Sequence, residues 1–366
     1  MGSQSSFNRA LNGYRGFCAL LVFVFHAGNA GVISTAELGV IPDFVWTSLR
    51  YGVEMFFMIS GYVILGSLLR HASIGQFLSD RFIRIYSAWL PALVSVSLVC
   101  ALFNAKMFQG MIAPERFRLF LANLLLLPPF VPLPLVHRGS WSLSYEWVFY
   151  FTAAVGAALQ RQRAGEGRWV TGIYLLLAAT FVFLFPRSTF FLTGVVVFMN
   201  AEWFERRRQW LQMPLLSMFV FLIAWRFTTV DEAELTITYW DFLGDYRWLA
   251  AIVAFVASLH MFACVVYRSS RQFSFLDSRV FQFLGRISYS FYLWHTLVMS
   301  VIKRLVTPFV VPHVGVGIGF SVFVLASGAV SLAISWLSWT LFEVRMAQAA
   351  QRIVSAMKAP QRSRAA

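Results

Sequence analysis

Two polar side chains, Arg15 and His26, stand eleven residues apart in an apolar run near the N-terminus. Eleven residues make about three helical turns, so both side chains lie on one face, about 16 Å apart along the axis. A neutral imidazole is an effective general base near pH 7. His26 is therefore a candidate catalytic base with a cation at the end of its helix. The alternative is a histidine that bonds to a neighbouring helix, with Arg15 as an anchor.

A second histidine occupies a comparable place late in the chain. Ser288, Tyr292 and His295 follow the spacing i, i+4, i+7 and therefore line one stripe of a helix. His295 should reach the same depth in its apolar run as His26 does. Two such histidines on different helices are hard to explain by packing alone. His260 has no polar companion in its run, so we interpret it as a packing residue.

Arg81 and Arg84 form a cationic pair on one face of a predicted helix. A pair of guanidinium groups suits phosphates, which it can grip bidentately. The alternative is that both residues only anchor the helix on the cytoplasmic side. Because Arg15 is expected at the same depth, three cationic groups could converge on one anionic ligand.

Acidic residues begin two other apolar runs. Glu54 lies two turns before Gly61 on one face, and we expect it to orient a histidine or to bind a sugar hydroxyl, unless it is an interfacial carboxylate. Ser142 and Glu146 share a face near Trp141. Aromatic rings beside hydroxyls and a carboxylate are typical of a carbohydrate-binding surface, and equally of the aromatic belt of a membrane protein.

The composition shows which kind of solvent these residues meet. Hydrophobic residues make up 59% of the 366 residues and charged residues 13%, against about a quarter charged in soluble proteins. A chain so apolar needs lipid around it. The net charge of +14 is distributed in short clusters between apolar runs, which is typical of cytoplasmic loops, so nucleic acid is not expected as a partner. No metal is expected, because the three cysteines lie inside apolar runs without ligand spacing.

The sequence predicts an all-α fold, a polytopic transmembrane helical bundle with about ten spanning helices. The predicted spans are residues 16–34, 51–69, 85–103, 141–159, 169–185, 188–203, 214–229, 248–267, 287–306 and 316–341. A further apolar run, 117–127, is followed by four prolines within residues 128–134. Prolines at this density exclude a regular spanning helix. We predict a short or re-entrant helix there, followed by an irregular loop that other helices protect.

The basic clusters predict the orientation in the membrane, because cytoplasmic loops are enriched in Lys and Arg. Residues 70–84 carry three arginines between the second and third spans, which places both termini in the cytoplasm. Later clusters then also fall inside, at Arg161/Arg163/Arg168, Arg206/Arg207/Arg208, Arg268/Arg271/Arg279 and the tail with Arg345, Arg352, Lys358, Arg362 and Arg364. An acidic stretch falls outside, with Asp231, Glu232, Glu234, Asp241 and Asp245. Residues 1–342 would form the transmembrane domain and residues 343–366 a basic cytoplasmic tail.

Five motifs together resemble the acyltransferase-3 family of integral membrane O-acyltransferases. In order along the chain they are the opening L-N-G-Y-R-G with Arg15 and His26, G-V-E-M-F-F-M-I-S-G at Gly52–Gly61, R-F-I-R at Arg81–Arg84, W-S-L-S-Y-E-W at Trp141–Trp147, and S-Y-S-F-Y-L-W-H at Ser288–His295. The resemblance covers about Leu11 to Phe342. Asn12 and Glu54 stand where aspartate is commoner in the family. The chain without a hydrolase-like second domain is similar to the stand-alone branch, which modifies exopolysaccharides, lipopolysaccharide or antibiotics.

The resemblance implies transfer of an acyl group, most often acetyl, from cytosolic acetyl-CoA to a hydroxyl of an extracytoplasmic or lipid-linked glycan. Arg15, Arg81 and Arg84 would hold the phosphates of coenzyme A. His26 would be the base or the acyl carrier, and Tyr292 or His295 would stabilise the oxyanion or orient the acceptor. Glu54, Trp141, Ser142 and Glu146 would then form the outer acceptor mouth.

Alternatives remain open from the sequence. The acceptor could be a small molecule such as an antibiotic. Intramembrane His and Glu residues could also serve the proton relay of a transporter or flippase, although no internal repeat is visible. The resemblance predicts a multi-pass protein of the bacterial plasma (inner) membrane. A homo-oligomer is compatible with its apolar surfaces.

Overall fold

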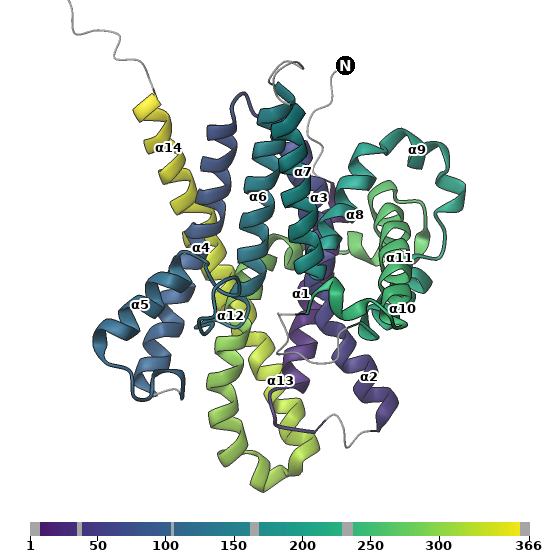
Figure 1. Ribbon diagram of the computed structural model, residues 1–366. Coiled ribbons are helices and arrows are strands. Elements are labelled where there is room, and N and C mark those ends of the chain that lie inside the picture. The colour runs from purple at the N-terminus through teal and green to yellow at the C-terminus, as the bar shows by residue number, and fades with distance from the viewer. Residues whose placement is uncertain (1–7, 35–38, 104–105, 162–167, 229–236, 359–366) are drawn as a thin grey trace, which may run out of the picture.

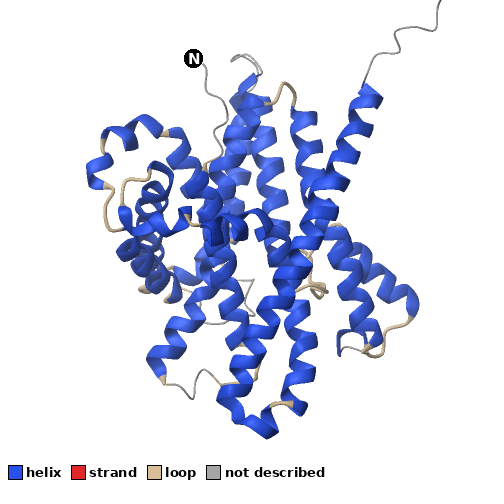
Figure 2. Ribbon diagram, turned by 180° about the vertical axis from the view of Figure 1, so that it is seen from behind, coloured by secondary structure: helices blue, strands red, loops and turns tan. Residues whose placement is uncertain are grey.

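The computed structural model describes residues 8–34, 39–103, 106–161, 168–228 and 237–358 of the chain. Over these ranges the chain forms helices and no strand (Figure 2). The prediction of an all-α fold is therefore confirmed. Some residues used to predict the orientation lie outside the described residues, namely Arg163, Asp231, Glu232, Glu234, Arg362 and Arg364.

Within the described ranges the chain forms fourteen α-helices (Figure 1). They are α1 (Arg9–Gly28), α2 (Val40–Ser48), α3 (Gly52–Arg70), α4 (Ile74–Leu102), α5 (Ala113–Leu124), α6 (Ser140–Arg161), α7 (Arg168–Leu184), α8 (Thr189–Met199), α9 (Ala201–Arg206), α10 (Pro214–Arg226), α11 (Arg247–Tyr267), α12 (Arg279–Phe309), α13 (Val311–Ser338) and α14 (Ala347–Lys358). A π-helical segment, η8 (Trp339–Met346), joins the last two.

In the part of the chain that the structure describes, five helical stretches are long and apolar enough to cross a membrane, or six if one bent pair counts as a single span. The five are Arg9–Gly28, Val40–Arg70, Ile74–Leu102, Arg247–Tyr267 and Val311–Arg352. The predicted spans 169–185 and 188–203 form the bent pair, Trp169–Leu184 and Pro186–Met199, which bends by 114° at the break between them. Predicted span 214–229 corresponds to α10, which has only 13 residues. α6 and α12, which contain the predicted spans 141–159 and 287–306, are long but are not among these candidate spans. The count of ten spans is not confirmed.

The proline-rich segment is short and irregular, as predicted. α5 has 12 residues, a length of about 18 Å that cannot cross the hydrocarbon core. The chain that follows is held by the buried amide of Asn123, which donates to the carbonyl oxygen of Pro134 at 3.0 Å and accepts from the backbone of Val136 at 2.9 Å. These bonds satisfy backbone groups that no regular element pairs. The segment thereby leads the chain into α6.

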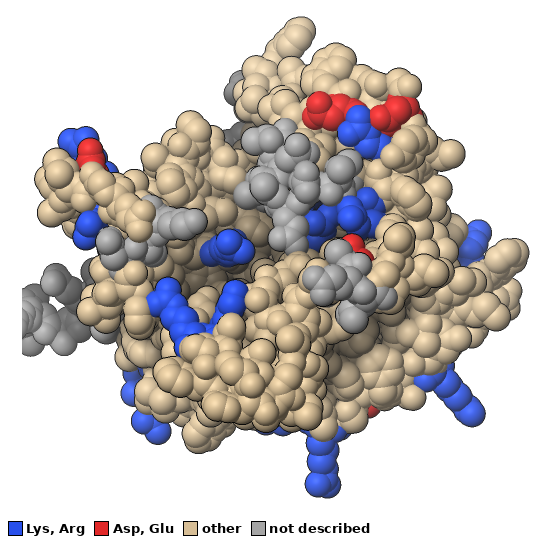
Figure 3. Space-filling view, turned by 90° about the horizontal axis from the view of Figure 1, so that it is seen from below, with Lys and Arg blue, Asp and Glu red and all other residues tan. Residues whose placement is uncertain are grey.

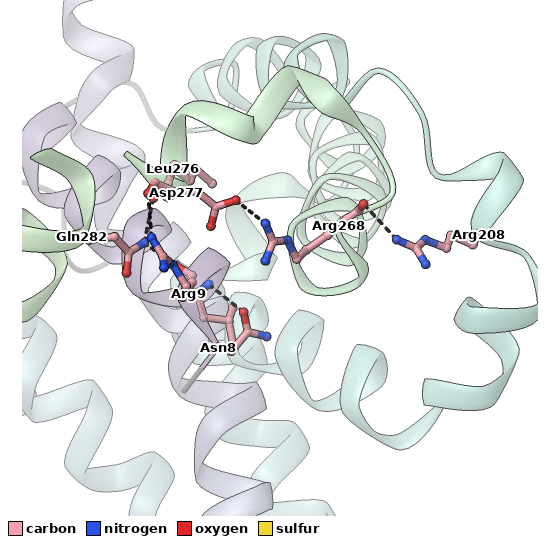
Figure 4. A network of polar contacts seen from close by, with 8 residues as sticks. Asn8, Arg9, Arg208, Arg268, Leu276, Asp277 and Gln282 are labelled. Carbon is pink, nitrogen blue, oxygen red and sulfur yellow. Dashed lines mark hydrogen bonds and ion pairs between the residues drawn. The ribbon is translucent and has the colours of Figure 1, made fainter. Parts of the chain in front are cut away.

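The start of α1 and the end of α14 lie at the same end of the bundle (Figure 1). A polar network secures this end (Figure 4), in which the side chain of Gln282 donates to the carbonyl oxygens of Arg9 and Leu276 at 2.7 and 2.8 Å. Arg208 donates to the carbonyl oxygen of Arg268 at 3.1 Å, so two of the predicted basic loops meet here. The assignment of this end to the cytoplasm stays a prediction.

Close backbone contact sets α1 and α12 side by side in a fixed register. A Cβ atom built on Gly16 would lie 2.7 Å from the backbone nitrogen of Gly285, and one on Gly285 would lie 2.0 Å from the carbonyl oxygen of Asn12. The Asn12 amide donates to Gln282, to its backbone oxygen at 2.9 Å and its side-chain oxygen at 3.1 Å. Only glycine permits this approach. The two helices therefore run in the same direction with Gly16 level with Gly285.

A close helix approach at Gly61 joins α3 to α8. A Cβ atom on Gly61 would lie 2.0 Å from the carbonyl oxygen of Phe191, and one on Gly194 would lie 2.0 Å from that of Met58. Neither position has room for a larger residue. The bent pair of α7 and α8 is thereby fixed against α3, which carries Glu54.

Candidate functional site

The structure places His26 and His295 beside each other, with ring centroids 5.2 Å apart. The register of α1 and α12 explains this position. Each histidine lies ten residues beyond the glycine contact, Gly16 on one helix and Gly285 on the other. Equal steps of about 15 Å along two helices that run in the same direction keep the two rings level. The spacing of the two motifs thus brings both imidazoles to one point in the bundle.

His295 presents an unsatisfied basic nitrogen at this point. The residue is 1% exposed, and its Nδ1 lies 2.9 Å from the carbonyl oxygen of Phe291 one turn earlier. A carbonyl can only accept, so Nδ1 carries the proton and Nε2 keeps its lone pair. Among the described residues, Nε2 has no hydrogen-bond partner. A buried acceptor without a partner is costly, which favours a role toward His26 or a ligand.

Beyond the histidines toward the start of α1 lies a cavity of about 790 Å³, here called the Arg15 cavity. Arg15, Arg81 and Arg84 all line it. Arg84 is exposed at its mouth, whereas Arg15 and Arg81 are half-buried. Arg81 donates to the hydroxyl of Ser67 at 3.2 Å, which fixes its position. The three cations predicted to converge are therefore placed in one cavity.

Ser142 and Glu146 also line the Arg15 cavity rather than an outer rim. The carboxylate of Glu146 accepts hydrogen bonds from Ser60, at 2.9 Å, and from Tyr150. The expectation of an outer mouth assumed that α6 enters the bundle from its surface. Instead the irregular segment before Ser140 folds inward, so α6 begins next to α12. Glu146 thus offsets part of the positive charge around Arg15.

A second cavity of about 1080 Å³, the His26 cavity, lies on the other side of this point. His26 and Trp141 line it, together with three arginines that sequence reasoning missed, Arg50, Arg138 and Arg187. Seen from the end opposite the start of α1, the molecule is hollowed and Lys and Arg side chains gather around the hollow (Figure 3). No carboxylate lines the His26 cavity among the described residues.

The signal for these arginines was present in the sequence but dispersed. Each is a single basic residue in a different connection, before α3, before α6 and at the break between α7 and α8. The predicted orientation puts all three connections outside, where basic residues are uncommon. Isolated cations on that side were a usable indication of an anion-binding site.

Glu54 serves Arg187 rather than a histidine. Its carboxylate is 0% exposed, lies 3.1 Å from Nη1 of Arg187 and accepts from Nε1 of Trp225 at 3.3 Å. The guanidinium of Arg187 lies 4.9 Å from the centre of the Trp141 ring, and both of these side chains line the His26 cavity. Glu54 lies behind that wall. It is therefore a positioning residue, which holds a cation of the cavity in place.

Tyr292 and Val53 line both cavities and so form the wall between them. The phenol of Tyr292 lies 3.0 Å from the carbonyl oxygen of Gly139 and 3.0 Å from the hydroxyl of Ser142. Its one proton can be donated to only one of these oxygens at a time. The phenol thus ties α12 to the start of α6, and this bonding competes with any donation to an oxyanion.

A further acidic residue was not singled out from the sequence. Glu343 lies in the π-helical segment η8 and accepts from the hydroxyl and backbone nitrogen of Ser290, at 2.5 and 3.1 Å. It also interacts electrostatically with Arg15. Single π-helical turns are frequent at functional sites, and this one brings a carboxylate close to the Arg15 cavity.

His260 makes structural bonds, in keeping with its interpretation as a packing residue. Its Nδ1 lies 2.6 Å from the hydroxyl of Ser217, and its Nε2 lies 3.1 Å from the carbonyl oxygen of Trp210. It lines neither the Arg15 nor the His26 cavity. Within the part of the chain that the structure describes, no group of three or more His, Cys, Asp or Glu side chains is placed to hold a metal ion.

These features define a helical membrane protein with two basic cavities that meet at a pair of histidines. Comparison with known proteins then gives the family. The sequence model of the acyltransferase-3 family, described as an acyltransferase domain, matches residues 8–340, so the chain belongs to this family. It is also 28% identical over 165 residues to a protein named Acyltransferase MdmB from Streptomyces mycarofaciens. That match covers 44% of this chain and 42% of the relative. No solved structure matches the chain.

Proposed function

We propose that the protein transfers an acyl group from acyl-CoA in the Arg15 cavity to a hydroxyl presented in the His26 cavity. The acyl group proposed is acetyl. The observation that carries this proposal is the shared wall. Tyr292 and Val53 face both cavities, and the histidine pair lies beside them. Two substrates bound in the two cavities would meet there. Family membership supports acyl transfer as the reaction class.

The Arg15 cavity suits the donor because coenzyme A carries phosphates and its acyl group sits on a long, narrow arm. Guanidinium groups bind phosphates through paired N–H donors. Arg84, exposed at the mouth, and Arg81 would hold the nucleotide end. The half-buried Arg15 would hold a group further inside. The arm would then extend between α3 and α12 toward the wall at Tyr292.

In the reaction, His26 accepts the proton of the acceptor hydroxyl as that oxygen attacks the thioester carbonyl. The carbon–sulfur bond breaks, and the thiolate of coenzyme A takes the proton back from the imidazolium. His295, with its lone pair on Nε2, can accept an N–H from His26 and so orient the lone pair of His26 toward the hydroxyl. A second route has His26 carry the acyl group itself for part of the cycle.

The acceptor proposed here is an extracytoplasmic or lipid-linked glycan, and a small-molecule acceptor is the alternative. The protein would lie in the bacterial plasma membrane as a multi-pass protein. With the start of α1 in the cytoplasm, acyl-CoA reaches the arginines from inside and the acceptor reaches His26 from outside.

The test is a His26→Ala variant compared with His260→Ala. Both remove a membrane-embedded imidazole, but only His26 lines a cavity. Purified protein in lipid nanodiscs would be supplied with radiolabelled acetyl-CoA and a crude glycolipid extract. We expect His26→Ala to lose acyl transfer and to keep acetyl-CoA binding by isothermal titration, and His260→Ala to keep both. Transfer by His26→Ala at the unmodified rate would contradict the assignment. A protein that moves its substrate chemically unchanged would instead be a transporter.

A further inference from the structure

A third cavity, of about 740 Å³, lies beside the His26 cavity and shares Arg138 with it. We call it the Arg304 cavity. Its walls come from the second half of α4 and the residues that follow it (Phe103 and Met107), from the segment before α6, and from α12. The residues that line it are Val96, Val99, Cys100, Phe103, Met107, Val136, His137, Arg138, Thr296, Leu297, Ser300, Val301 and Arg304. It has two guanidinium groups and, among the described residues, no carboxylate.

Arg304 is arranged to bind an anion. Its guanidinium lies 4.1 Å from the centre of the Phe103 ring. Stacking on a ring covers one face of the group and leaves the N–H donors, which lie in its plane, directed outward. Among the described residues, neither Arg304 nor Arg138 has an ion-pair partner. Two guanidinium groups that line one cavity without an acidic lining residue among the described residues favour an anionic ligand.

The segment that carries Arg138 is fixed on both sides of it. The Nε2 of His137 lies 2.7 Å from the carbonyl oxygen of Leu293, and its Nδ1 accepts from the backbone nitrogen of Gly139 at 3.0 Å. The imidazole is 1% exposed and both ring nitrogens are used, so its role is structural. Arg138 is thereby held at the junction of the two cavities, where its exposed side chain faces both.

The outer surface around the Arg304 cavity is apolar. On α4, Leu98, Leu102 and Phe103 are 59%, 81% and 53% exposed, and on α12 Leu305 and Phe309 are 53% and 69% exposed. Such surfaces on a membrane protein contact lipid chains. An arginine that lies among them is costly unless an anion pairs with it. A ligand that suits both the guanidinium groups and the apolar surface has a negatively charged group attached to a hydrocarbon chain.

We propose that the Arg304 cavity binds the phosphate of a lipid whose chain leaves the bundle between α4 and α12. Resting on the proposed function, the same lipid carries the acceptor hydroxyl, which reaches His26 by passing Arg138. The phosphate pairs with Arg304 and Arg138, while the hydrocarbon chain of the lipid stays in the bilayer. Acceptors would therefore enter from the side of the protein, separately from acyl-CoA, which enters at the end of the bundle.

The experiment measures lipid retention by native mass spectrometry on the full-length protein in detergent. The probes are geranylgeranyl monophosphate, the corresponding alcohol geranylgeraniol, and inorganic phosphate. Arg304→Gln is compared with Lys303→Gln, which removes one charge from the neighbouring position, where the side chain approaches Gly31 outside the cavity. We expect Arg304→Gln to weaken binding of the monophosphate about tenfold, the loss of one charge-assisted hydrogen bond. Lys303→Gln should bind it as the unmodified protein does.

The outcomes separate this proposal from the proposed function. Equal binding by Arg304→Gln and Lys303→Gln, or equal binding of the monophosphate and the alcohol, would overturn the lipid-phosphate site. If inorganic phosphate were retained as tightly as geranylgeranyl monophosphate, the hydrocarbon chain of the lipid would contribute nothing to binding, and the proposal of a lipid ligand would be overturned. Lipid binding that depends on Arg304 in a protein that never consumes acyl-CoA would leave the site in place and contradict the acyltransferase. Acyl transfer by a protein that does not bind the lipid monophosphate would support the acyltransferase and contradict the lipid-phosphate site.

Discussion

The Arg15 and His26 cavities lie back to back, and both are basic, but their charges are built in different ways. In the Arg15 cavity, two of the three cations come from one turn of α4, and Glu146 stands among them. In the His26 cavity, the cations come from three separate connections, and no described lining residue is acidic. In the Arg15 cavity the carboxylate of Glu146 therefore offsets part of the positive charge. The His26 cavity has an excess of positive charge that an anionic acceptor would satisfy.

Both cavities depend on the contact between α1 and α12, so the largest effect should follow from its loss. In Gly285→Val the new side chain would meet the carbonyl oxygen of Asn12, to which even a Cβ would lie 2.0 Å away. Backbone on both sides leaves little room to adjust, and we expect a destabilisation above about 4 kcal/mol. The measurement is the apparent melting temperature in detergent.

Gly172→Val is the matched control, because a Cβ at Gly172 would meet nothing within 4 Å. It should melt like the unmodified protein. If Gly285→Val kept both its melting temperature and its acyl transfer, the helix register would not be what brings His26 to His295.

The next largest effect tests how the His26 cavity holds its charge. Glu54→Gln leaves the buried guanidinium of Arg187 without its counter-charge, and breaking one side of such a pair costs about 3 kcal/mol or more. The double variant Glu54→Gln/Arg187→Gln removes both charges and should recover part of that loss. Chemical unfolding of four proteins, the unmodified protein, Glu54→Gln, Arg187→Gln and the double variant, gives the coupling energy. Additive effects would show that the two residues act independently, and would restore Glu54 as a candidate for direct contact with substrate.

This pair also shows where sequence reasoning ends. Periodicity and composition predicted the all-α fold and the short α5, because these depend on neighbouring residues. Arg81 and Arg84 could be paired because four positions span one turn. Arg187 could not be assigned to Glu54 from the sequence, since 133 positions separate them and only the bend between α7 and α8 brings them together. For the same reason the sequence could not place Ser142 and Glu146 in the lining of the Arg15 cavity. The inward path of the segment before α6 depends on the buried side chains of Asn123 and His137.

A smaller effect, on binding alone, separates the two cavities directly. In Arg81→Ala/Arg84→Ala the Arg15 cavity loses two of its three guanidinium groups. If this cavity holds the donor, acetyl-CoA should bind about 10- to 100-fold more weakly, because one or two charge-assisted hydrogen bonds are lost. Arg138→Ala should leave acetyl-CoA binding unchanged while lowering transfer. Isothermal titration with acetyl-CoA measures the first, and product formation the second. If Arg138→Ala weakened acetyl-CoA binding as much as the double variant did, the donor would extend through both cavities, and their assignment to two substrates would fail.

The smallest effect concerns the wall that the cavities share. Tyr292→Phe keeps the ring between them and removes only the hydroxyl, whose bonds to Gly139 and Ser142 are intramolecular. If the phenol is a tie between α12 and α6, its loss costs about 1 kcal/mol of stability and changes the rate less than about tenfold. If it stabilises an oxyanion, its loss should lower kcat about 100- to 1000-fold while the KM for acyl-CoA stays the same. Because the structure commits the one phenolic proton to Gly139 or Ser142, we expect the smaller result. A large fall in kcat at unchanged melting temperature would mean that the phenol leaves these partners when both substrates are bound, and that the wall itself takes part in the reaction.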